Sequence, residues 1–135
     1  MSREAWTRVA VGYLTAMALL VGAWAQFAPQ SFYDSFPGLG RAWVSVDGPY
    51  NEHLVRDVGG LYLAFAVVGV ATFVTLSRTL ILAFSAAALA TGVPHAIYHA
   101  TNRAGLGTGD LVANLAGLAV AAAIPVALIV MWRSA

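Results

Sequence analysis

Residues 111–132 read LVANLAGLAVAAAIPVALIVMW, an apolar run without a charged side chain. A helix needs about 20 mostly apolar residues to cross a lipid bilayer, so this stretch predicts a transmembrane span. Similar stretches lie at residues 6–27, 51–76 and 80–101, and the second of these has a polar start. We therefore expect an all-α fold, a bundle of four transmembrane helices that forms a single domain over residues 1–135.

The composition agrees with a protein whose main partner is the lipid bilayer. The chain has 135 residues, of which 60% are hydrophobic and only 10% charged, which departs from the composition of ordinary soluble domains. The net charge of +1 provides no basic footprint, so nucleic acid is not an expected partner. The absence of cysteine excludes disulfides, thiolate metal ligands and cysteine catalysis. All basic residues are Arg, a usage typical of GC-rich bacterial genes.

The connections between the expected spans are unequal in length. A tight turn at residues 77–79 joins the second span to the third, and a Gly-rich loop at residues 102–110 joins the third to the fourth. Only the first connection, residues 29–50, is long, and its aromatic residues argue against disorder. Phe32, Phe36 and Trp43 suit a partly buried segment that packs over one mouth of the bundle.

The arginines give a narrow preference for the orientation in the membrane. Arg3, Arg8, Arg78 and Arg133 lie at the end that holds both termini, whereas Arg41, Arg56 and Arg103 lie at the other end. The positive-inside rule counts basic residues and gives little weight to acids. We therefore expect a multi-pass protein of the bacterial plasma membrane with both termini in the cytoplasm and the long first connection on the extracytoplasmic side.

Polar side chains gather at the expected extracytoplasmic end, in pairs four residues apart that share one helix face. The pairs are His53 with Asp57 on the second span, His95 with His99 on the third, and Asp110 with Asn114 on the fourth. Ionisable groups within a bilayer are costly, so they are candidates for a functional site. We expect the three histidines to converge in one pocket, with Asp57 and Asp110 beside them.

The residue types in this cluster point to a metal. Two histidines spaced as in His95-x-x-x-His99 are a common chelating pair on a helix. His53 and a carboxylate from Asp57 or Asp110 would complete three or four ligands, a set that suits Zn, Fe or Cu. The segment between the two histidines lacks the Glu of a HExxH metalloprotease.

An open coordination position on such a metal would activate a bound water for hydrolysis or proton transfer. Asp57 and Tyr98 are then the candidate catalytic residues. The function expected is a metal-dependent enzyme or redox protein that acts on a lipophilic or interfacial small molecule. Heme held by His53 with His95 or His99 is the alternative cofactor, without covalent attachment because the chain has no CxxCH motif. A quinone is a further alternative ligand.

The same residues also have purely structural interpretations. These are an N-cap for Asn51 or Asp110, a salt bridge between Glu52 and Arg56, an ion pair of Asp57 with Arg103 or Arg56, and an interfacial position for His99. Gly59 and Gly60 allow close approach of another helix or of a flat ligand. The alternative function is a non-catalytic accessory subunit, in a homo-oligomer or a larger membrane complex, whose polar network only specifies packing.

Two stretches carry a resemblance to known proteins. PYNEHLVRDVGGLYLAF at residues 49–65, followed by PHAIYHATN at residues 94–102, is similar to a pattern in hypothetical membrane proteins of actinobacteria. The small size, four spans and long first connection resemble the small DoxX-like membrane proteins over the whole chain. The resemblance implies a four-span architecture and a redox partnership in the membrane, and it identifies no site residue.

Overall fold

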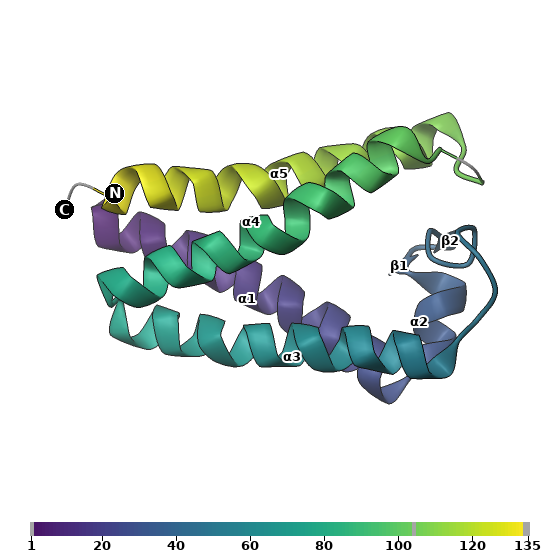
Figure 1. Cartoon of the computed structure of the whole chain (residues 1–135), viewed down its shortest axis with the longest axis horizontal. Coiled ribbons are helices and arrows are strands. Elements are labelled where there is room, and N and C mark those ends of the chain that lie inside the picture. The colour runs from purple at the N-terminus through teal and green to yellow at the C-terminus, as the bar shows by residue number, and fades with distance from the viewer. Residues whose placement is uncertain (1, 104, 134–135) are drawn as a thin grey trace.

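The computed structural model describes residues 2–103 and 105–133, and the fold is all-α apart from one very short strand pair. The four long helices are α1 (Arg3–Phe27), α3 (Glu52–Thr75), α4 (Arg78–Thr101) and α5 (Thr108–Trp132) (Figure 1). Each of them is long and apolar enough to cross a membrane. The four expected helices are therefore confirmed, and their ends differ from the expected ones by at most three residues.

Local sequence explains where the helices begin and end. The Asn51 side chain accepts a hydrogen bond of 3.1 Å from the Leu54 backbone N–H, so the predicted N-cap of α3 is confirmed. At the other end of α3, Leu76 has a left-handed backbone with φ 48°, which turns the chain directly into α4. The tight turn is thus made by Leu76 and Ser77, slightly earlier than expected.

The four helices form two pairs rather than an evenly packed bundle. Helix α1 packs along α3 and α4 packs along α5, whereas the contacts between these two pairs are much sparser. The pairs lie close together at the end that holds Arg3, Trp132 and the α3–α4 turn, and they diverge toward the opposite end (Figure 1). We call the first of these the terminal end.

Glycine makes the α1–α3 pairing close. A methyl group placed on Gly59 would lie 2.5 Å from the backbone nitrogen of Gln26, and one on Gly22 would lie 2.9 Å from that of Leu63. Such distances are shorter than van der Waals contact, so these positions leave no room for a side chain. The sequence left open whether Gly59 allows the approach of another helix or of a flat ligand, and the structure shows the approach of another helix.

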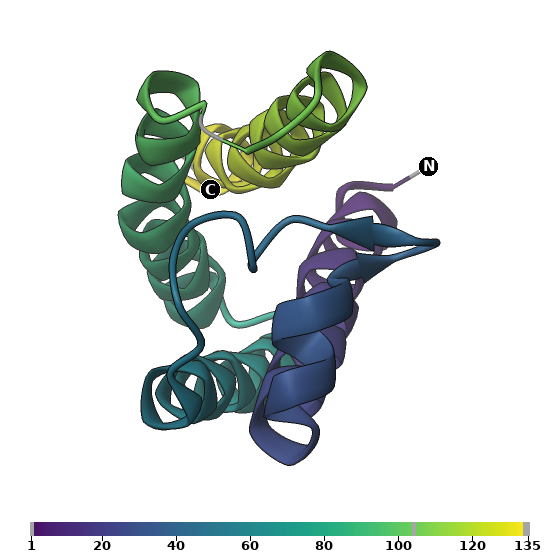
Figure 2. The same ribbon diagram turned by 90° about the vertical axis from the view of Figure 1, so that its right-hand side faces the viewer.

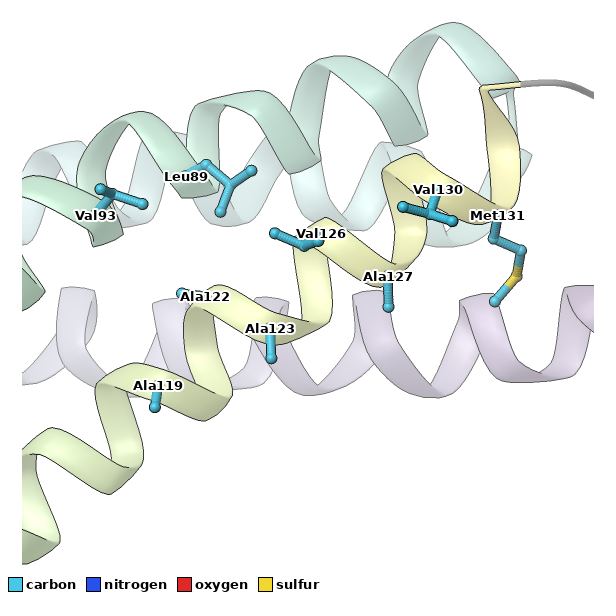
Figure 3. A pocket seen from close by; sticks show the side chains of 9 residues that line it. All are labelled: Leu89, Val93, Ala119, Ala122, Ala123, Val126, Ala127, Val130 and Met131. Atoms are coloured by element: carbon cyan, nitrogen blue, oxygen red, sulfur yellow. The ribbon is translucent and has the colours of Figure 1, made fainter.

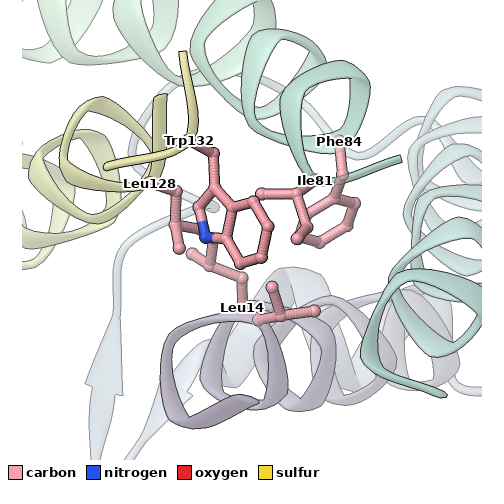
Figure 4. Packing of buried hydrophobic residues seen from close by; sticks show 6 residues of the cluster. Leu14, Ile81, Phe84, Leu128 and Trp132 are labelled. Carbon is pink, nitrogen blue, oxygen red and sulfur yellow. The ribbon is translucent and has the colours of Figure 1, made fainter. Parts of the chain in front are cut away.

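The main hydrophobic core lies at the terminal end. Leu128 and Trp132 of α5 converge with Ile81 and Phe84 of α4 on Leu14 of α1 (Figure 4). This cluster is where the two helix pairs meet, and Phe84 also stacks on Phe65 of α3 with ring centroids 4.3 Å apart. The core therefore holds the pairs together at one end and leaves the other end to be closed by different residues.

The first connection closes the diverging end and is largely structured. It contains helix α2 (Pro29–Ser35) and the antiparallel strands β1 (Pro37–Gly38) and β2 (Arg41–Ala42), which were not expected in an all-α fold. The aromatic rings of Phe32, Phe36 and Trp43 follow one another at centroid distances of 4.9 and 6.3 Å. Figure 2 shows this segment passing across the diverging end, so its predicted position over one mouth of the bundle is confirmed. We call this the capped end.

Candidate functional site

All three histidines lie at the capped end. His53 is in the first turn of α3, and His95 and His99 are in the last two turns of α4. Asp110 is in the first turn of α5, the helix that follows. The prediction that these polar groups gather at one end of the molecule is therefore confirmed.

The structure divides the predicted ligands into separate pairings. His53 Nδ1 lies 3.3 Å from an oxygen of Asp57, and both side chains are mainly exposed. His95 and His99 contact each other, with ring centroids 4.7 Å apart and planes nearly perpendicular. Within residues 2–103 and 105–133, no group of three or more His, Asp or Glu side chains is placed to hold a metal ion. His53 is thus not gathered with the other two, because α3 belongs to the other helix pair, which diverges here.

His99 lies on the inner face of α4. His99 is only 6% exposed, and the other buried residues of α4 are Ile81, Phe84 and Ser85, which belong to or border the core. His95 is one turn before His99 on the same side of the helix, but its side chain is exposed. The structural alternative in which His99 simply faces lipid headgroups is wrong, because the side chain is buried.

Asn114 of α5 adds a buried polar group at this end of the α4–α5 pair. It lies six residues after the first residue of α5 (114 − 108), and His95 lies six before the last residue of α4 (101 − 95). At a rise of about 1.5 Å per residue, both are about 9 Å from the ends that the loop connects. The predicted equal depth of His95 and Asn114 is confirmed.

The amide of Asn114 is poorly satisfied for a buried group. The residue is 7% exposed, and its Oδ1 has no hydrogen-bond partner among the described residues. A buried acceptor left without a partner is destabilising, so such groups are usually bound to water or to a ligand. Asn114 is therefore a stronger candidate for a site residue than its sequence position indicated. The sequence signal that pointed to it was its position four residues after Asp110.

Contacts from the first connection hold the cap over this region. The carboxylate of Asp110 pairs with the Arg41 guanidinium and accepts a 3.0 Å hydrogen bond from the indole N–H of Trp43. Gly105 of the α4–α5 loop lies so close to Val46 that a methyl group there would be 2.6 Å from the Val46 Cβ. The cap is thus attached to the α4–α5 pair at two points.

The cap also brings an acid near the histidine pair. The carboxylate of Asp47, in the irregular part of the first connection, lies close enough for its charge to act on His95. Asp47 was not singled out from the sequence, because nothing in the local pattern relates it to His95, which is more than forty residues away.

Two structural alternatives for the acids are corrected. Asp110 is not an N-cap: α5 begins at Thr108 after Gly107, and the Asp110 carboxylate is used by Arg41 and Trp43 instead. Asp57 does not form the expected ion pair with Arg56 or Arg103, since its partner is His53.

The salt bridge between Glu52 and Arg56 is confirmed, with 2.8 Å between a guanidinium nitrogen and a carboxylate oxygen. It is a pair of partly exposed side chains four residues apart on α3, so it contributes little to stability. Neither residue is needed to explain the arrangement of the histidines.

The arginines have a structural role that sequence reasoning missed. In the last turn of each long helix, one backbone carbonyl accepts a hydrogen bond from an arginine side chain. The donors and acceptors are Arg56 to Gln26 of α1, Arg8 to Phe73 of α3, Arg103 to Ala100 of α4, and Arg78 to Trp132 of α5. The last carbonyls of a helix lack intrahelical partners, and a cation is favourable at this end of the helix dipole. Three of these bonds come from a different helix, so the sequence shows no local signal for them.

The two predicted catalytic residues lie apart. Asp57 is paired with His53 on α3, whereas Tyr98 is on α4 with its ring edge-on to that of His99, at a centroid distance of 5.4 Å. Tyr98 is half-exposed. Of the two, only Tyr98 is therefore adjacent to the His95–His99 pair.

An apolar groove follows the seam between α4 and α5 (Figure 3). Its volume is about 690 Å³, and it is lined by Leu89, Val93, Ala119, Ala122, Ala123, Val126, Ala127, Val130 and Met131. Most of these residues are exposed, and none has a polar side chain. The groove therefore offers shape and apolar surface but no group that could perform chemistry.

Comparison with family models, with curated proteins and with solved structures gave no match. The resemblance to DoxX-like membrane proteins consequently stays a prediction. What the chain does has to be argued from its own residues and their geometry.

Proposed function

We propose that the chain is a multi-pass protein of the bacterial plasma membrane that crosses the bilayer four times. The support is that α1, α3, α4 and α5 are all long and apolar enough to span it. Four arginines at the terminal end against three at the capped end favour both termini in the cytoplasm and an extracytoplasmic first connection. This orientation exposes the capped end to the outside of the cell.

Labelling of single cysteines in intact cells tests this orientation, because the natural chain has none. Asp47→Cys in the exposed first connection should react with a membrane-impermeant maleimide. Ser77→Cys in the α3–α4 turn should react only after the cells are opened. The reverse pattern would invert the proposed orientation, and equal reaction of both in intact cells would contradict four spans.

We propose that the functional centre is the His95–His99 pair beneath the cap, and that it binds a divalent metal, with Zn, Fe and Cu as the candidates. The observation that carries the proposal is the contact of the two imidazoles one turn apart on α4, with His99 buried and His95 exposed. Two imidazole nitrogens and the free amide oxygen of Asn114 form a donor set suited to these ions.

The chemistry of such a centre depends on its remaining coordination positions. Fewer than four protein ligands leave a place for water or for a substrate atom, and a bound metal supplies Lewis acidity there. Tyr98, whose ring contacts that of His99, is the nearest candidate proton donor. We propose a lipophilic or interfacial substrate, because the pair lies in the last two turns of α4, a helix apolar enough to span the membrane.

Elemental analysis of gently purified protein tests the metal directly. We expect stoichiometric metal in the wild type and its loss in both His95→Ala and His99→Ala. Glu52→Ala, which removes a salt bridge at the same end without touching α4, is the matched control and should keep the metal. A metal-free wild type whose melting temperature does not change with added zinc would refute the proposal.

Heme is the alternative cofactor, and the visible absorbance of the pure protein distinguishes it from a simple metal. A bis-histidine heme needs one histidine on each of two facing helices. His53 is the only histidine outside α4 in the chain, and it is mainly exposed and paired with Asp57. The structure therefore favours a metal or a quinone-like ligand at the α4 pair over heme.

A second candidate function is that of a non-catalytic accessory subunit, and the α4–α5 groove favours it. Small residues such as Ala119, Ala123 and Ala127 let a helix of a partner or of a second copy approach closely. Val126→Trp should fill the groove and disrupt such a complex on a native gel. Val70→Trp, an exposed position on α3 outside the groove, is the control. If neither variant changes the size of the complex, the groove is covered by lipid.

A further inference from the structure

One large apolar side chain is exposed more than any other in the described part of the molecule. Leu39 is 99% exposed, whereas the next most exposed large apolar residue, Phe27, is 75% exposed. Leu39 lies in the connection between β1 and β2, at the tip of the small hairpin in the first connection. Packing within the chain therefore does not explain a leucine at this position.

Backbone preference does not explain it either. Leu39 has a φ of 59°, and its neighbours Gly38 and Gly40 have φ values of 97° and 75°. This left-handed region suits glycine or asparagine and disfavours leucine. No atom lies within 4 Å of a methyl group placed on either glycine, so the tip stands clear of the rest of the chain. A leucine at this position is therefore expected to be stabilised by a contact outside the chain.

The base of the hairpin is firmly attached. Arg41 pairs with Asp110 of α5, and the backbone N–H of Trp43 donates a 2.7 Å hydrogen bond to the Phe36 carbonyl. The rings of Trp43 and Phe36 also pack edge-on. The only charge next to the tip, that of Arg41, is thus neutralised by Asp110. The hairpin is a fixed projection with an apolar, uncharged tip.

The direction in which the hairpin projects determines what its tip can contact. Figure 1 shows the hairpin level with the ends of α3 and α5 at the capped end. In Figure 2, seen from that end, the hairpin points sideways beyond α1 and α2, away from the centre of the bundle. If the long helices span a bilayer, this level and direction place the tip over the surrounding lipid.

We propose that Leu39 inserts into the interfacial region of the outer lipid leaflet and fixes the cap against the membrane surface. This inference rests on the proposed membrane insertion and orientation. Lipid is favoured over a protein partner because a specific protein interface buries about 800 Å² on each side. The tip offers one large side chain between two glycines, which a bilayer interface accommodates without any complementary surface.

Spin labelling of single cysteines in nanodiscs tests the proposal. The labelled positions are Leu39→Cys, Asp47→Cys in the exposed part of the same connection, and Val126→Cys on the exposed side of α5. Collisions with oxygen report lipid, and collisions with a water-soluble nickel chelate report water. We expect the label at residue 39 to lose access to the nickel chelate and to gain access to oxygen relative to residue 47.

The outcomes separate this inference from the membrane proposal. A lipid-exposed label at residue 126 with a water-exposed label at residue 39 would overturn the role of Leu39 and leave the spans intact. A water-exposed label at residue 126 would overturn the spans themselves. A label at residue 39 that is shielded from both reagents would show that a second copy of the chain covers the tip, which also contradicts the lipid contact.

Discussion

The indole N–H of Trp132 donates a buried hydrogen bond of 2.9 Å to the hydroxyl of Thr7. It joins the last turn of α5 to the beginning of α1, near the two ends of the described chain. Arg78 from the α3–α4 turn donates to the Trp132 carbonyl, and the Arg3 guanidinium lies over the Trp132 ring at 4.2 Å. Trp132 therefore connects the end of α5 to the beginnings of α1 and α4.

Replacing Thr7 by Val should destabilise the protein. The shape is nearly preserved, but the Trp132 N–H is left buried without a partner, which costs about 1–3 kcal/mol. A thermal unfolding curve in detergent measures the loss. Thr91→Val is the control, since its exposed hydroxyl bonds only to the Ala87 carbonyl of its own helix. Equal melting temperatures of the two variants would show that the Thr7–Trp132 bond is unimportant.

Gly59→Ala should separate α1 from α3. The added methyl group would lie 2.5 Å from the Gln26 nitrogen, and overpacking of this kind costs about 1–3 kcal/mol. Gly117→Ala is matched in chemistry but has nothing within 4 Å of the new methyl group. Because alanine is the better helix former by about 1 kcal/mol, that variant should be at least as stable as the wild type. Opposite shifts in melting temperature are the expected result.

Asp110→Asn should loosen the cap with little effect on global stability. The carboxylate pairs with Arg41 and Trp43 at a partly exposed site, so the lost energy is small. The first connection would however lose one of its two attachments to the α4–α5 pair. Hydrogen exchange should become faster in residues 36–47 and stay unchanged in α1. If exchange in the cap does not change, the Val46–Gly105 contact alone holds it.

Zinc-dependent stabilisation should disappear at acidic pH. Imidazole must be neutral to bind a metal, and ordinary histidine takes up a proton below about pH 6.5. Added zinc should therefore raise the melting temperature at pH 8 and lose this effect as the pH falls through that range. His53→Ala should keep the whole effect, since His53 is paired with Asp57 and not with the α4 histidines. Equal loss in His53→Ala and His95→Ala would instead support a shared site.

Asn114→Leu should increase stability while weakening ligand binding. The substitution removes a buried oxygen that has no partner in the described structure, which lowers the cost of folding without ligand. The same oxygen is the proposed acceptor or ligand beside His95, so zinc should raise the melting temperature less than in the wild type. A variant that is less stable and binds zinc normally would assign Asn114 a purely structural hydrogen bond.

The sequence by itself determined the helices and the end at which the polar residues gather. Length and apolarity define a span, and Asn51 caps α3, because these are properties of neighbouring residues. The pairs His53–Asp57 and His95–His99 follow from the helical repeat, which brings residues four apart onto one face. For the same reason the equal depth of His95 and Asn114 could be predicted from the short loop between α4 and α5.

Only the tertiary structure decided which of these faces meet. The division into α1–α3 and α4–α5 separates His53 from His95, and it depends on how glycines such as Gly59 let one particular pair approach closely. Asp110 could serve equally as a cap or as a partner, and the choice was made by Arg41, which is distant in sequence. The spacing of residues along a helix specifies the level of a side chain on the helix axis. The neighbours of that side chain depend instead on packing between segments that are distant in sequence, and the local sequence pattern does not show which segments pack together.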